Sequence, residues 1–483
     1  MAKKPSKQPP IVEPKLPASP DHARGPMTFA AANRYLASLT NLERVHAAHI
    51  DQDKIKLDRM RRLLDALDNP EASLRCVHVA GSKGKGSVCE MTAAAVAGCG
   101  YSVGLYTSPH LVDVRERIRV NGRLITKKDF SDRVADVAAA ASTLDETAGP
   151  PTYFEALTAA ALLAFRRAGV DLAVVEVGLG GRLDSTNLVH PDVTVVTELQ
   201  LEHTQILGDT LGLIAAEKAG IFKPGVPAVT QEQDQEAMRV LAQTAADVGA
   251  PLRVLRAQAE GATTLDFTER FEADHEHGPH VRVSLITERV RFEHVPVPLP
   301  GTHQGRNAGL ALAALDALAE QGFKLPEIGV VEGLAGTPRS GRLEVINEHP
   351  RIVVDGAHTP PSIASLVAAV GATMAHDSVA VVFGCAQDKD IDAALKQIGR
   401  GADKIIFTKA RDNPRAADPK KLAERYRELT DKSADTAPTV KDAINAAARG
   451  VGNDDLILVT GSFYIAGEAK LLLAERQKHA ARA

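Results

Sequence analysis

The stretch "VHVAGSKGKGSV" (residues 77–88) passes from an apolar strand through small residues into the start of a helix. A glycine-rich loop in this position binds phosphate in many α/β proteins, because its backbone N–H groups and the helix N-terminus point at the anion. The Gly-Lys pair of the loop is followed by Gly86, so the hydroxyl of the common phosphate-binding motif comes one place late, at Ser87. We favour phosphate binding by Lys85 and its neighbours over the structural alternative, a strand-to-helix turn with solvated lysines.

Outward from this loop, apolar strands alternate with alanine-rich helices. "RCVHVA", "SVGLYTS", "LAVVEVG" and "VTVVTEL" have the pattern of strands, and "EALTAAALLAFRRAG" has the pattern of a helix. Continuous apolar strands separated by helices indicate a parallel sheet that is covered on both faces. Residues 252–300 are less regular and predict a few antiparallel strands, and "HQGRNAGLALAALDALAEQG" predicts one helix that ends at Gly322.

A chain of 483 residues is too long for one typical core, so we expect more than one domain. Residues 1–26 are rich in Pro, Lys and Ser and predict a disordered tail. We expect a first α/β domain over 27–336, with a mainly parallel sheet of the P-loop type, and a linker at 337–343. Residues 344–483 contain "RIVVDGAH", "SVAVVFGC", "KIIFTKA" and "DLILVTGSF", which predict a smaller Rossmann-like α/β domain.

Composition and charge exclude several classes of function. A net charge of −4 gives no electrostatic footprint for nucleic acid or an anionic membrane. No apolar run reaches the roughly 18 residues that span a bilayer, and no secretory signal follows the N-terminal lysines. The four cysteines lie far apart and in no metal-ligand spacing. We therefore expect a cytoplasmic protein with reduced thiols that binds neither nucleic acid nor membranes.

Polar residues stand at the ends of the predicted strands. Glu176 lies inside an apolar strand, where an unpaired carboxylate is costly, so it predicts a metal ligand or a salt bridge to Arg182. His203 follows another strand, at the end of a parallel sheet where ligands gather. Ser108 lies in a loop after a third strand. A lone histidine is more often structural, but several polar residues expected at one edge of the sheet favour a metal site.

Ten blocks, taken in order, resemble the folylpolyglutamate synthases, including bifunctional members that are also dihydrofolate synthases, within the Mur-type ATP-dependent amide ligases. The resemblance covers roughly residues 28–475. The blocks are "HVAGSKGKGSV", "GLYTSPHL…ERIRVNG", "TYFEALTAAALLAF", "VVEVGLGGRLDSTN", "LEHTQILGDTLGLIAAEKAGIFKPG", "GTHQGRNAGLAL", "SGRLEVI", "VVDGAHTPPS", "FGCAQDKD" and "GSFYIAGE". In this family the loop has the form Gly-x-x-Gly-Lys-Gly-Ser, so the late serine is the family pattern.

The resemblance implies roles for particular residues. It implies that the ATP phosphates are held by Gly81, Ser82, Lys83, Gly84, Lys85, Gly86 and Ser87. It implies two Mg²⁺ ions, one bound by Ser108 and Glu176 and a second bound with help from His203. Lys218 alone would be interpreted as a half-buried lysine in a salt bridge, but it corresponds to a lysine that is carbamylated in the family. Lys85, Glu176, His203 and Lys218 are therefore the candidate catalytic residues.

The resemblance also implies the remaining contacts of the substrates. ATP would be contacted by Asn307, Arg342 and Asp355, which come from the helix, the linker and the second domain. Tyr153, Phe154 and Glu155 lie where bifunctional members contact the pteroate, and His358 is expected near the same cleft. The chain departs from the family pattern at Lys83, usually Asn, at Glu202, usually Asp, and at Thr359, usually Asn. Ser340 precedes Gly341 in a region that commonly has Trp, and the chain has no Trp. These departures bear on substrate identity more than on ligase chemistry.

These inferences predict an ATP-dependent ligase that adds L-glutamate to dihydropteroate, to reduced folates, or to both. ATP would phosphorylate the substrate carboxyl, and the amine of glutamate would then displace phosphate. The alternative within this chemistry is a related ligase that joins an amino acid to a different carboxylate. A rival of another class is a nucleotide-binding regulator that hydrolyses ATP slowly. We expect a monomer whose partners are small-molecule substrates.

Overall fold

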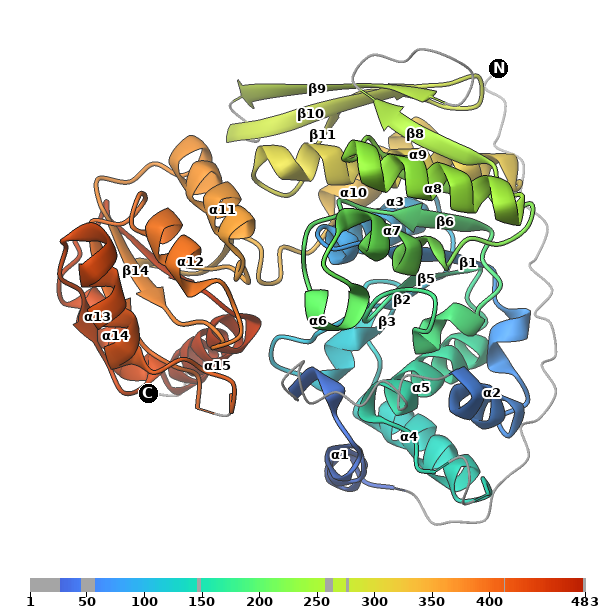
Figure 1. Cartoon of the computed structure of the whole chain (residues 1–483), viewed down its shortest axis with the longest axis horizontal. Coiled ribbons are helices and arrows are strands. Elements are labelled where there is room, and N and C mark those ends of the chain that lie inside the picture. Colours follow the sequence, from blue (N-terminus) through green and yellow to red (C-terminus); the bar gives the residue numbers. More distant parts are fainter. Residues whose placement is uncertain are drawn as a thin grey trace, which may run out of the picture.

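The computed structural model divides the chain into two lobes, each built on its own sheet (Figure 1). It describes residues 27–44, 57–145, 149–256, 264–274, 278–411 and 413–480. The tail expected at residues 1–26 lies outside this part of the chain. Within it, no helix is both long enough and apolar enough to cross a membrane. Three of the cysteines are buried, Cys99 is half-buried, and all four are free thiols, in keeping with their predicted packing role.

The larger lobe contains an 11-stranded sheet in the order β11-β10-β9-β8-β7-β6-β1-β5-β2-β3-β4. Its seven strands from β9 to β2 run parallel, and antiparallel strands flank them at both edges, as the irregular stretch after residue 252 predicted for one edge. The strands are β1 (Cys76–Ala80), β2 (Val103–Tyr106), β3 (Ile118–Val120), β4 (Arg123–Leu124), β5 (Leu172–Glu176), β6 (Val193–Val196), β7 (Ala228–Gln231), β8 (Leu252–Arg256), β9 (Thr264–Asp274), β10 (Gly278–Ile286) and β11 (Arg291–Pro296).

Helices cover both faces of this sheet, which is why its central strands are apolar throughout. All residues of β1, β5 and β6 are buried. One core lies between the sheet and α3 (Lys85–Gly98), α9 (Thr302–Glu320) and α10 (Glu327–Ala335). A second core lies under α1 (Phe29–Ser38), α2 (Leu57–Asp65), α4 (Lys127–Ala141) and α5 (Tyr153–Ala168). A third lies near α6 (Thr204–Leu207), α7 (Leu211–Ala219) and α8 (Gln235–Val248).

The helix α3 packs closely against α10 because glycines face one another at the contact. A Cβ added to Gly98 would lie 2.2 Å from the carbonyl oxygen of Gly329. A Cβ on Gly333 would lie 2.2 Å from the carbonyl oxygen of Ala94. The two backbones therefore touch, and no larger side chain fits between them without a shift. Because α3 carries the glycine-rich loop at its N-terminus, this contact fixes the loop from behind.

The smaller lobe contains a six-stranded sheet in the order β12-β13-β17-β14-β15-β16. The four strands predicted from the sequence are its parallel centre, and two short strands that were not predicted, β12 and β16, form its edges. The strands are β12 (Glu344–Glu348), β13 (Arg351–Val354), β14 (Val379–Phe383), β15 (Lys404–Phe407), β16 (Asp435–Thr436) and β17 (Leu456–Thr460). The helices are α11 (Pro360–Thr373), α12 (Ile391–Ile398), α13 (Pro419–Thr430), α14 (Val440–Ala448) and α15 (Phe463–Ala480), and they cover both faces.

Candidate active site

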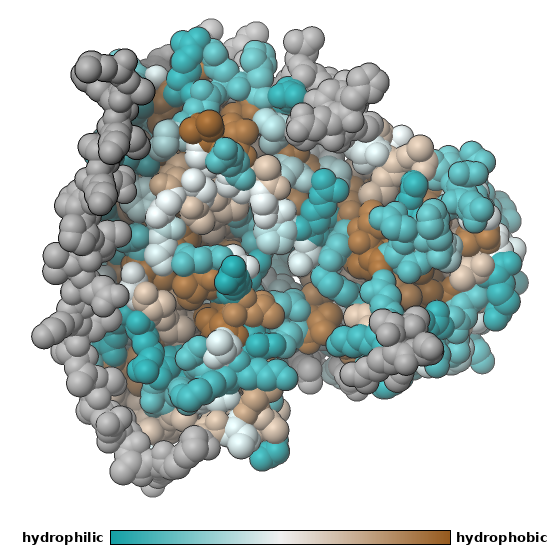
Figure 2. Space-filling model, turned by 180° about the vertical axis from the view of Figure 1, so that it is seen from behind, coloured by the Kyte–Doolittle hydropathy of each residue, from teal (hydrophilic) through white to brown (hydrophobic). Residues whose placement is uncertain are grey.

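A large cleft lies between the two lobes, with a volume of about 1250 Å³. Its walls come from the loops that follow β1, β5 and β6 in the larger lobe and β13, β14 and β17 in the smaller lobe. Seen from behind, the surface is hollowed between the lobes (Figure 2). Ligands of open α/β sheets bind at the carboxyl ends of the strands, and here two such ends face one cleft.

The glycine-rich loop is fastened to the loop that follows β6. The backbone N–H groups of Ser82 and Lys83 both donate to the carbonyl oxygen of Glu198, at 2.9 and 3.1 Å. The hydroxyl of Thr197 donates to the carbonyl oxygen of Lys83 at 2.6 Å. These bonds leave the first N–H groups of α3, which have no acceptor within the helix, as the donors that face the cleft.

Two glycines of the loop adopt backbone conformations that a side chain would obstruct. Gly81 has a φ of 145°, and an added Cβ would lie 1.8 Å from Oγ1 of Thr197. Gly84 has a φ of 85°, and its Cβ would lie 2.2 Å from Oδ1 of Asn307. The glycines thus let α3 begin close to two other elements, and Asn307 on α9 reaches the start of the helix.

Two lysine side chains contact the same carbonyl oxygen of the loop. Nζ of Lys85 donates to the carbonyl oxygen of Gly81 at 3.0 Å, and Nζ of Lys218, on α7, donates to the same oxygen at 2.9 Å. Lys218 is 4 % exposed. Burial, with a smaller contribution from the positive charge of Lys85, lowers the pKa of Lys218 to about 7. Lys218 has no salt-bridge partner within the described residues, so the interpretation of this residue as a salt-bridged lysine is wrong.

Glu176 ends β5 with its carboxylate turned into the cleft. It is 4 % exposed, and its Oε2 accepts a hydrogen bond of 2.9 Å from the backbone N–H of Ser108. Burial raises the pKa of Glu176, while the charge of Lys85 and the bond from Ser108 oppose the rise. The salt bridge to Arg182, which was the structural alternative for this carboxylate, does not form, because Arg182 pairs with Glu217 at 2.7 Å.

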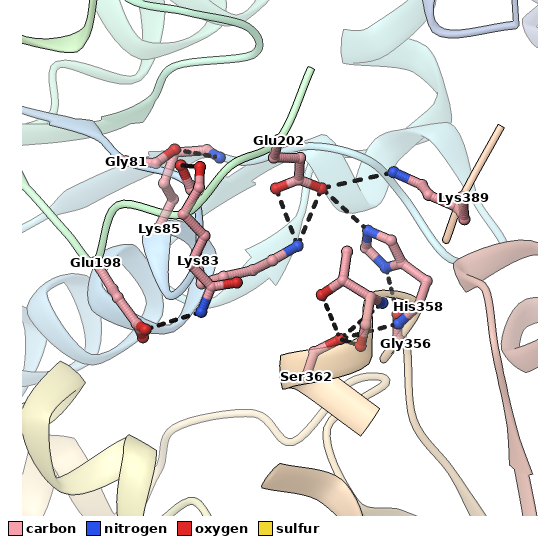
Figure 3. Close-up of polar contacts among 12 residues, drawn as sticks. Gly81, Lys83, Lys85, Glu198, Glu202, Gly356, His358, Ser362 and Lys389 are labelled. Atoms are coloured by element: carbon pink, nitrogen blue, oxygen red, sulfur yellow. Dashed lines mark hydrogen bonds and ion pairs between the residues drawn. The ribbon is translucent and has the colours of Figure 1, made fainter. Parts of the chain in front are cut away.

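Glu202 lies at the centre of a group of charges contributed by both lobes (Figure 3). Its carboxylate oxygens lie 2.9 Å from Nζ of Lys83, 3.4 Å from Nε2 of His358 and 3.7 Å from Nζ of Lys389. Burial opposes its ionisation, but the contact with His358 and the charge of Lys83 hold the pKa of Glu202 well below its usual range. Two of the departures from the family pattern, Lys83 and Glu202, are thus in direct contact.

The neighbouring residues complete this part of the cleft. His203 precedes α6 with a φ of 54° and lies among the residues that line the cleft. Thr359, the third departure, begins α11, where its Oγ1 lies 2.9 Å from Oγ of Ser362. Its backbone N–H donates to the same oxygen at 2.9 Å. Thr359 therefore has a structural role as a helix cap.

The segment between the lobes brings further candidate residues to the glycine-rich loop. A Cβ added to Gly86 would lie 2.5 Å from Nη2 of Arg342, so the guanidinium lies directly over the first turn of α3. Asp355, after β13, accepts hydrogen bonds of 2.9 and 2.8 Å from the backbone N–H groups of Leu343 and Ala357. Burial raises the pKa of Asp355 to about 6. Both residues line the same cleft as Lys85.

The three residues at the start of α5 differ in how they meet the cleft. Tyr153 lies under the guanidinium of Arg117, whose carbon is 5.5 Å from the ring centre. Phe154 packs against Gly178. Glu155 is 3 % exposed, caps α5 together with Thr152, and forms a bidentate ion pair of 2.7 and 2.9 Å with Arg59. The carboxylate of Glu155 is thus already engaged, whereas the two aromatic rings present apolar surface.

Sequence reasoning assigned no role to three basic residues of the smaller lobe that line the cleft, Lys389, Arg411 and Arg415. Arg415 donates to the backbone carbonyl of Glu43 at 3.1 Å and pairs with Asp388, so it links the lobes. Lys389 falls inside the block "FGCAQDKD", whose two aspartates around a lysine are the signal that could have pointed to it. Arg415 lies outside every block and carries no such signal.

The oxygen donors of the cleft suit a hard cation. Within the described residues no group of three or more His, Cys, Asp and Glu could hold a metal ion by itself. The carboxylate of Glu176 and the hydroxyls of Ser87 and Ser108 are nevertheless the type of ligand that Mg²⁺ takes together with waters and nucleotide phosphates. The donor set therefore fits an ion that arrives with a nucleotide rather than an all-protein metal site.

Both lobes match models of known protein families. Residues 79–315 match the Mur ligase middle domain, and residues 341–463 match the glutamate ligase domain of Mur ligases. The chain is 34 % identical over 417 residues to the dihydrofolate synthase/folylpolyglutamate synthase of Bacillus subtilis, covering 86 % of this chain and 94 % of the relative. It is 38 % identical over 425 residues, 87 % of this chain, to a probable bifunctional folylpolyglutamate synthase/dihydropteroate synthase of Haloferax volcanii, of whose length it spans 48 %.

Among solved structures, the Mycobacterium tuberculosis folylpolyglutamate synthase complexed with ADP superposes with a TM-score of 0.81. It is 30 % identical to this chain, and the superposition covers 92 % of this chain and 98 % of that structure. The superposition therefore includes both lobes.

Proposed function

The chain belongs to the folylpolyglutamate synthase/dihydrofolate synthase family of Mur ligases, and from this premise we infer that it is an ATP-dependent folate–glutamate ligase. It adds L-glutamate to dihydropteroate, to the glutamate tail of reduced folates, or to both. The observation that carries this function is the cleft itself. In it the glycine-rich loop of the larger lobe faces Arg342, from the segment between the lobes, and Asp355, from the smaller lobe.

The reaction needs ATP because hydroxide is a poor leaving group from a carboxylic acid. Transfer of the γ-phosphoryl group to the substrate carboxylate gives an acyl phosphate and ADP. The neutral amine of glutamate then attacks the acyl carbon, and inorganic phosphate leaves from the tetrahedral intermediate as the amide forms. Two lobes suit this sequence, because nucleotide, acid and amine must be aligned while water, which would hydrolyse the acyl phosphate, is excluded.

The glycine-rich loop holds the phosphates of ATP in this proposal. The donors are the backbone N–H groups at the start of α3, and the positive helix end adds to their effect. The residues proposed for this site are Gly81, Ser82, Gly84, Lys85, Gly86 and Ser87, together with Asn307, Arg342 and Asp355. The ammonium of Lys85 neutralises charge on the transferring phosphoryl group. Its contact with the carbonyl oxygen of Gly81 holds it at the loop.

Magnesium is the proposed metal. When bound, it would neutralise charge on the nucleotide phosphates. Ser108 and Glu176 would hold one ion and His203 would help to hold a second, each together with phosphate and water oxygens. The support is the buried carboxylate of Glu176, which accepts a single backbone hydrogen bond and lines the same cleft as Ser87 and Ser108.

Carbamylation of Lys218 is proposed as a modification of the same site. An amine reacts with CO₂ only in its neutral form, and the pKa of about 7 that burial gives Lys218 makes much of this amine neutral near neutral pH. The product replaces a buried cation by an anionic oxygen donor. That exchange also reduces the repulsion between Lys218 and Lys85, which share one carbonyl acceptor.

The acid substrate is proposed to bind against the start of α5. Tyr153 and Phe154 offer rings on which a pterin can stack, and Glu155 lies behind them. His358 lines the cleft from the smaller lobe and is proposed to contact the reacting end of the acid. The proposed boundaries are a ligase domain at 27–336, a linker at 337–343 and a glutamate ligase domain at 344–483. We further expect a monomer in the cytoplasm.

Mass spectrometry of products tests this function directly. The purified chain is incubated with ATP, Mg²⁺ and glutamate, and with either dihydropteroate or tetrahydrofolate. One glutamate added to dihydropteroate establishes the synthase activity, and successive additions to the folate establish the polyglutamating activity. ATP binding with no amide product from either pterin contradicts the proposal. Turnover of another acid would then favour the related ligase, and no product from any acid would favour a regulator.

A further inference from the structure

The ammonium of Lys83 contacts both carboxylate oxygens of Glu202, at 3.0 and 2.9 Å. The two side chains are 19 % and 11 % exposed, so the pair is largely removed from water. A lysine on a phosphate loop would be expected to extend toward the nucleotide. Here the side chain of Lys83 instead extends to Glu202, in the loop that follows β6 (Figure 3).

The backbone of Lys83 is held as firmly as its side chain. Its N–H donates to the carbonyl oxygen of Glu198, and its own carbonyl oxygen accepts from the hydroxyl of Thr197. The neighbouring hydroxyl of Ser82 donates to the carbonyl oxygen of Gln200 at 3.1 Å. Main chain and side chain thus connect the same two loops, and the N–H and the ammonium of Lys83 are both already engaged within the protein.

On its other side, Glu202 meets the smaller lobe. Its Oε1 lies 3.4 Å from Nε2 of His358 and 3.7 Å from Nζ of Lys389. Nδ1 of His358 lies 2.8 Å from the carbonyl oxygen of Gly356, so Nδ1 carries a proton. Glu202 is thus contacted by three basic side chains, Lys83 from the larger lobe and His358 and Lys389 from the smaller lobe.

The loop that presents Lys389 is itself fixed. The N–H of Gln387 donates to the carbonyl oxygen of Arg415 at 2.8 Å, and its side-chain amide donates to the carbonyl oxygen of Ala416 at 2.9 Å. Arg415 also pairs with Asp388 and reaches Glu43 in the larger lobe. A displacement of Glu202 would therefore disturb the loop that carries Lys389, which is held in the smaller lobe by these hydrogen bonds.

We propose that Lys83 is a positioning residue that holds the Glu202 carboxylate as a bridge between the phosphate loop and the smaller lobe, and is not a ligand of the ATP phosphates. The inference rests on the ligase function proposed above, since it concerns how the two halves of that site are held together. Lys85 and the N-terminus of α3 supply the positive charge for phosphate, which leaves Lys83 free for this role. Removal of Lys83 leaves a half-buried carboxylate with one cation fewer and loosens the smaller lobe's hold on the loop.

A double-mutant cycle with Lys83→Met, Glu202→Gln and the combined variant tests the proposal. Lys83→Met is expected to lower kcat about tenfold or more, while the KM for ATP and the Kd for ADP change less than about threefold. The combined variant is expected to be no slower than the slower single variant, because both changes break one interaction. Lys83→Arg keeps the charge and is expected to retain kcat within about threefold. A tenfold or larger rise in the Kd for ADP with Lys83→Met, or effects that multiply in the combined variant, would overturn the proposal.

Hydrogen–deuterium exchange supplies a measurement that does not depend on turnover. Lys83→Met and Glu202→Gln are both expected to speed exchange in the segments around His358 and Lys389, which belong to the other lobe. Unchanged exchange there in both variants would overturn the bridge, even if turnover falls. Lys404→Gln, which removes a smaller-lobe lysine paired with Asp435 at an exposed edge, is the matched control and should alter neither measurement. If the unmodified chain forms no amide product, the proposed function fails, and exchange still decides whether the bridge exists.

Discussion

At the scale of single residues, the cleft is defined by ionisable side chains that are buried without conventional partners. Among the residues that the structure describes, Glu176 has one backbone donor and no cation in contact, and Lys218 has a carbonyl acceptor in place of a carboxylate. Each arrangement costs stability in the empty protein. Each becomes favourable when a group of opposite charge arrives, so these residues mark the places where ligands or modifications bind.

Replacement of Glu176 by glutamine tests the proposed metal role. The amide keeps the shape and can still accept the hydrogen bond from Ser108, but it loses the charge that would bind Mg²⁺. We expect kcat to fall by about 10² or more while the free energy of unfolding stays equal or rises, because a desolvated charge is removed. Product formation at graded Mg²⁺ concentrations and urea unfolding measure the two effects. Glu232→Gln, at an exposed site, is the control, and near-normal turnover of the Glu176 variant would refute the role.

Lys218 should make stability depend on pH. Its pKa falls from 10.5 to about 7 on folding, so between these values the unfolded chain holds a proton that the folded chain has released. The free energy of unfolding therefore rises with pH across this window. Lys218→Met removes the effect, and we expect the variant to be more stable below pH 7 by on the order of a few kcal/mol, with the difference fading toward pH 10.

Urea unfolding of both proteins in bicarbonate-free buffer, at several pH values across this range, measures the difference. Bicarbonate is left out so that the amine of Lys218 stays unmodified. Lys404→Met, at an exposed position at the start of β15, should show a difference that does not change with pH. A pH-independent difference for Lys218→Met would contradict the lowered pKa.

At the scale of elements, the loop and helix that face the nucleotide depend on backbone conformations rather than on side chains. The order strand, glycine-rich loop, helix was predictable because the small residues and the flanking patterns are local. The attachment of the loop to Glu198 and Thr197 was not predictable, since it joins segments more than 100 residues apart. The edge strands β12 and β16 were missed for a different reason: β12 has no buried residue and β16 consists of two exposed residues, so neither has the apolar run that marked the central strands.

Two Gly→Ala substitutions, one in the glycine-rich loop and one outside it, distinguish the effect of backbone strain from the effect of a steric clash. Gly84 and Gly100 have similar φ values of 85° and 90°, but a Cβ meets Asn307 at the first site and nothing within 4 Å at the second. Both Gly→Ala changes should cost about 1–2 kcal/mol of stability through the left-handed backbone. Only Gly84→Ala should also weaken ADP binding, by about tenfold or more, as measured by calorimetry. Equal ADP affinities for the two variants would show that the close approach of Asn307 is unimportant.

At the scale of the whole molecule, the site exists only where the two lobes meet. The strand and helix patterns of the sequence predicted both α/β units, and the family resemblance supplied most of the candidate site residues, all of which except Gly81 and Lys218 line the cleft. It could not show that Lys83, Glu202 and Lys389 lie together, since that contact depends on how the lobes are placed against each other. It also led to a salt bridge for Glu176 as the structural alternative, whereas Arg182 turns away to Glu217.

Arg342 provides a test of binding across the lobes. Its guanidinium lies over Gly86, and within the described part of the chain its side chain has only a long hydrogen bond of 3.4 Å to the carbonyl oxygen of Ser340. We expect Arg342→Ala to leave the Tm of the nucleotide-free protein nearly unchanged. The stabilisation by ADP, about 2.7 kcal/mol at a concentration 100 times the Kd, should fall because the Kd rises. Thermal unfolding with and without ADP measures this, with exposed Arg339→Ala as control. An unchanged response to ADP would remove Arg342 from the nucleotide site.

The contact of α3 with α10 through facing glycines has a consequence for biosynthesis. The helix that carries the phosphate loop is translated early, by residue 98, but the helix that it touches backbone to backbone begins only at Glu327. Until that later segment has left the ribosome, the inner face of α3 lacks its closest neighbour. A nascent chain therefore contains the complete loop sequence long before the loop can bind a nucleotide. ATP can first stabilise the protein when nearly all of the larger lobe has been synthesised.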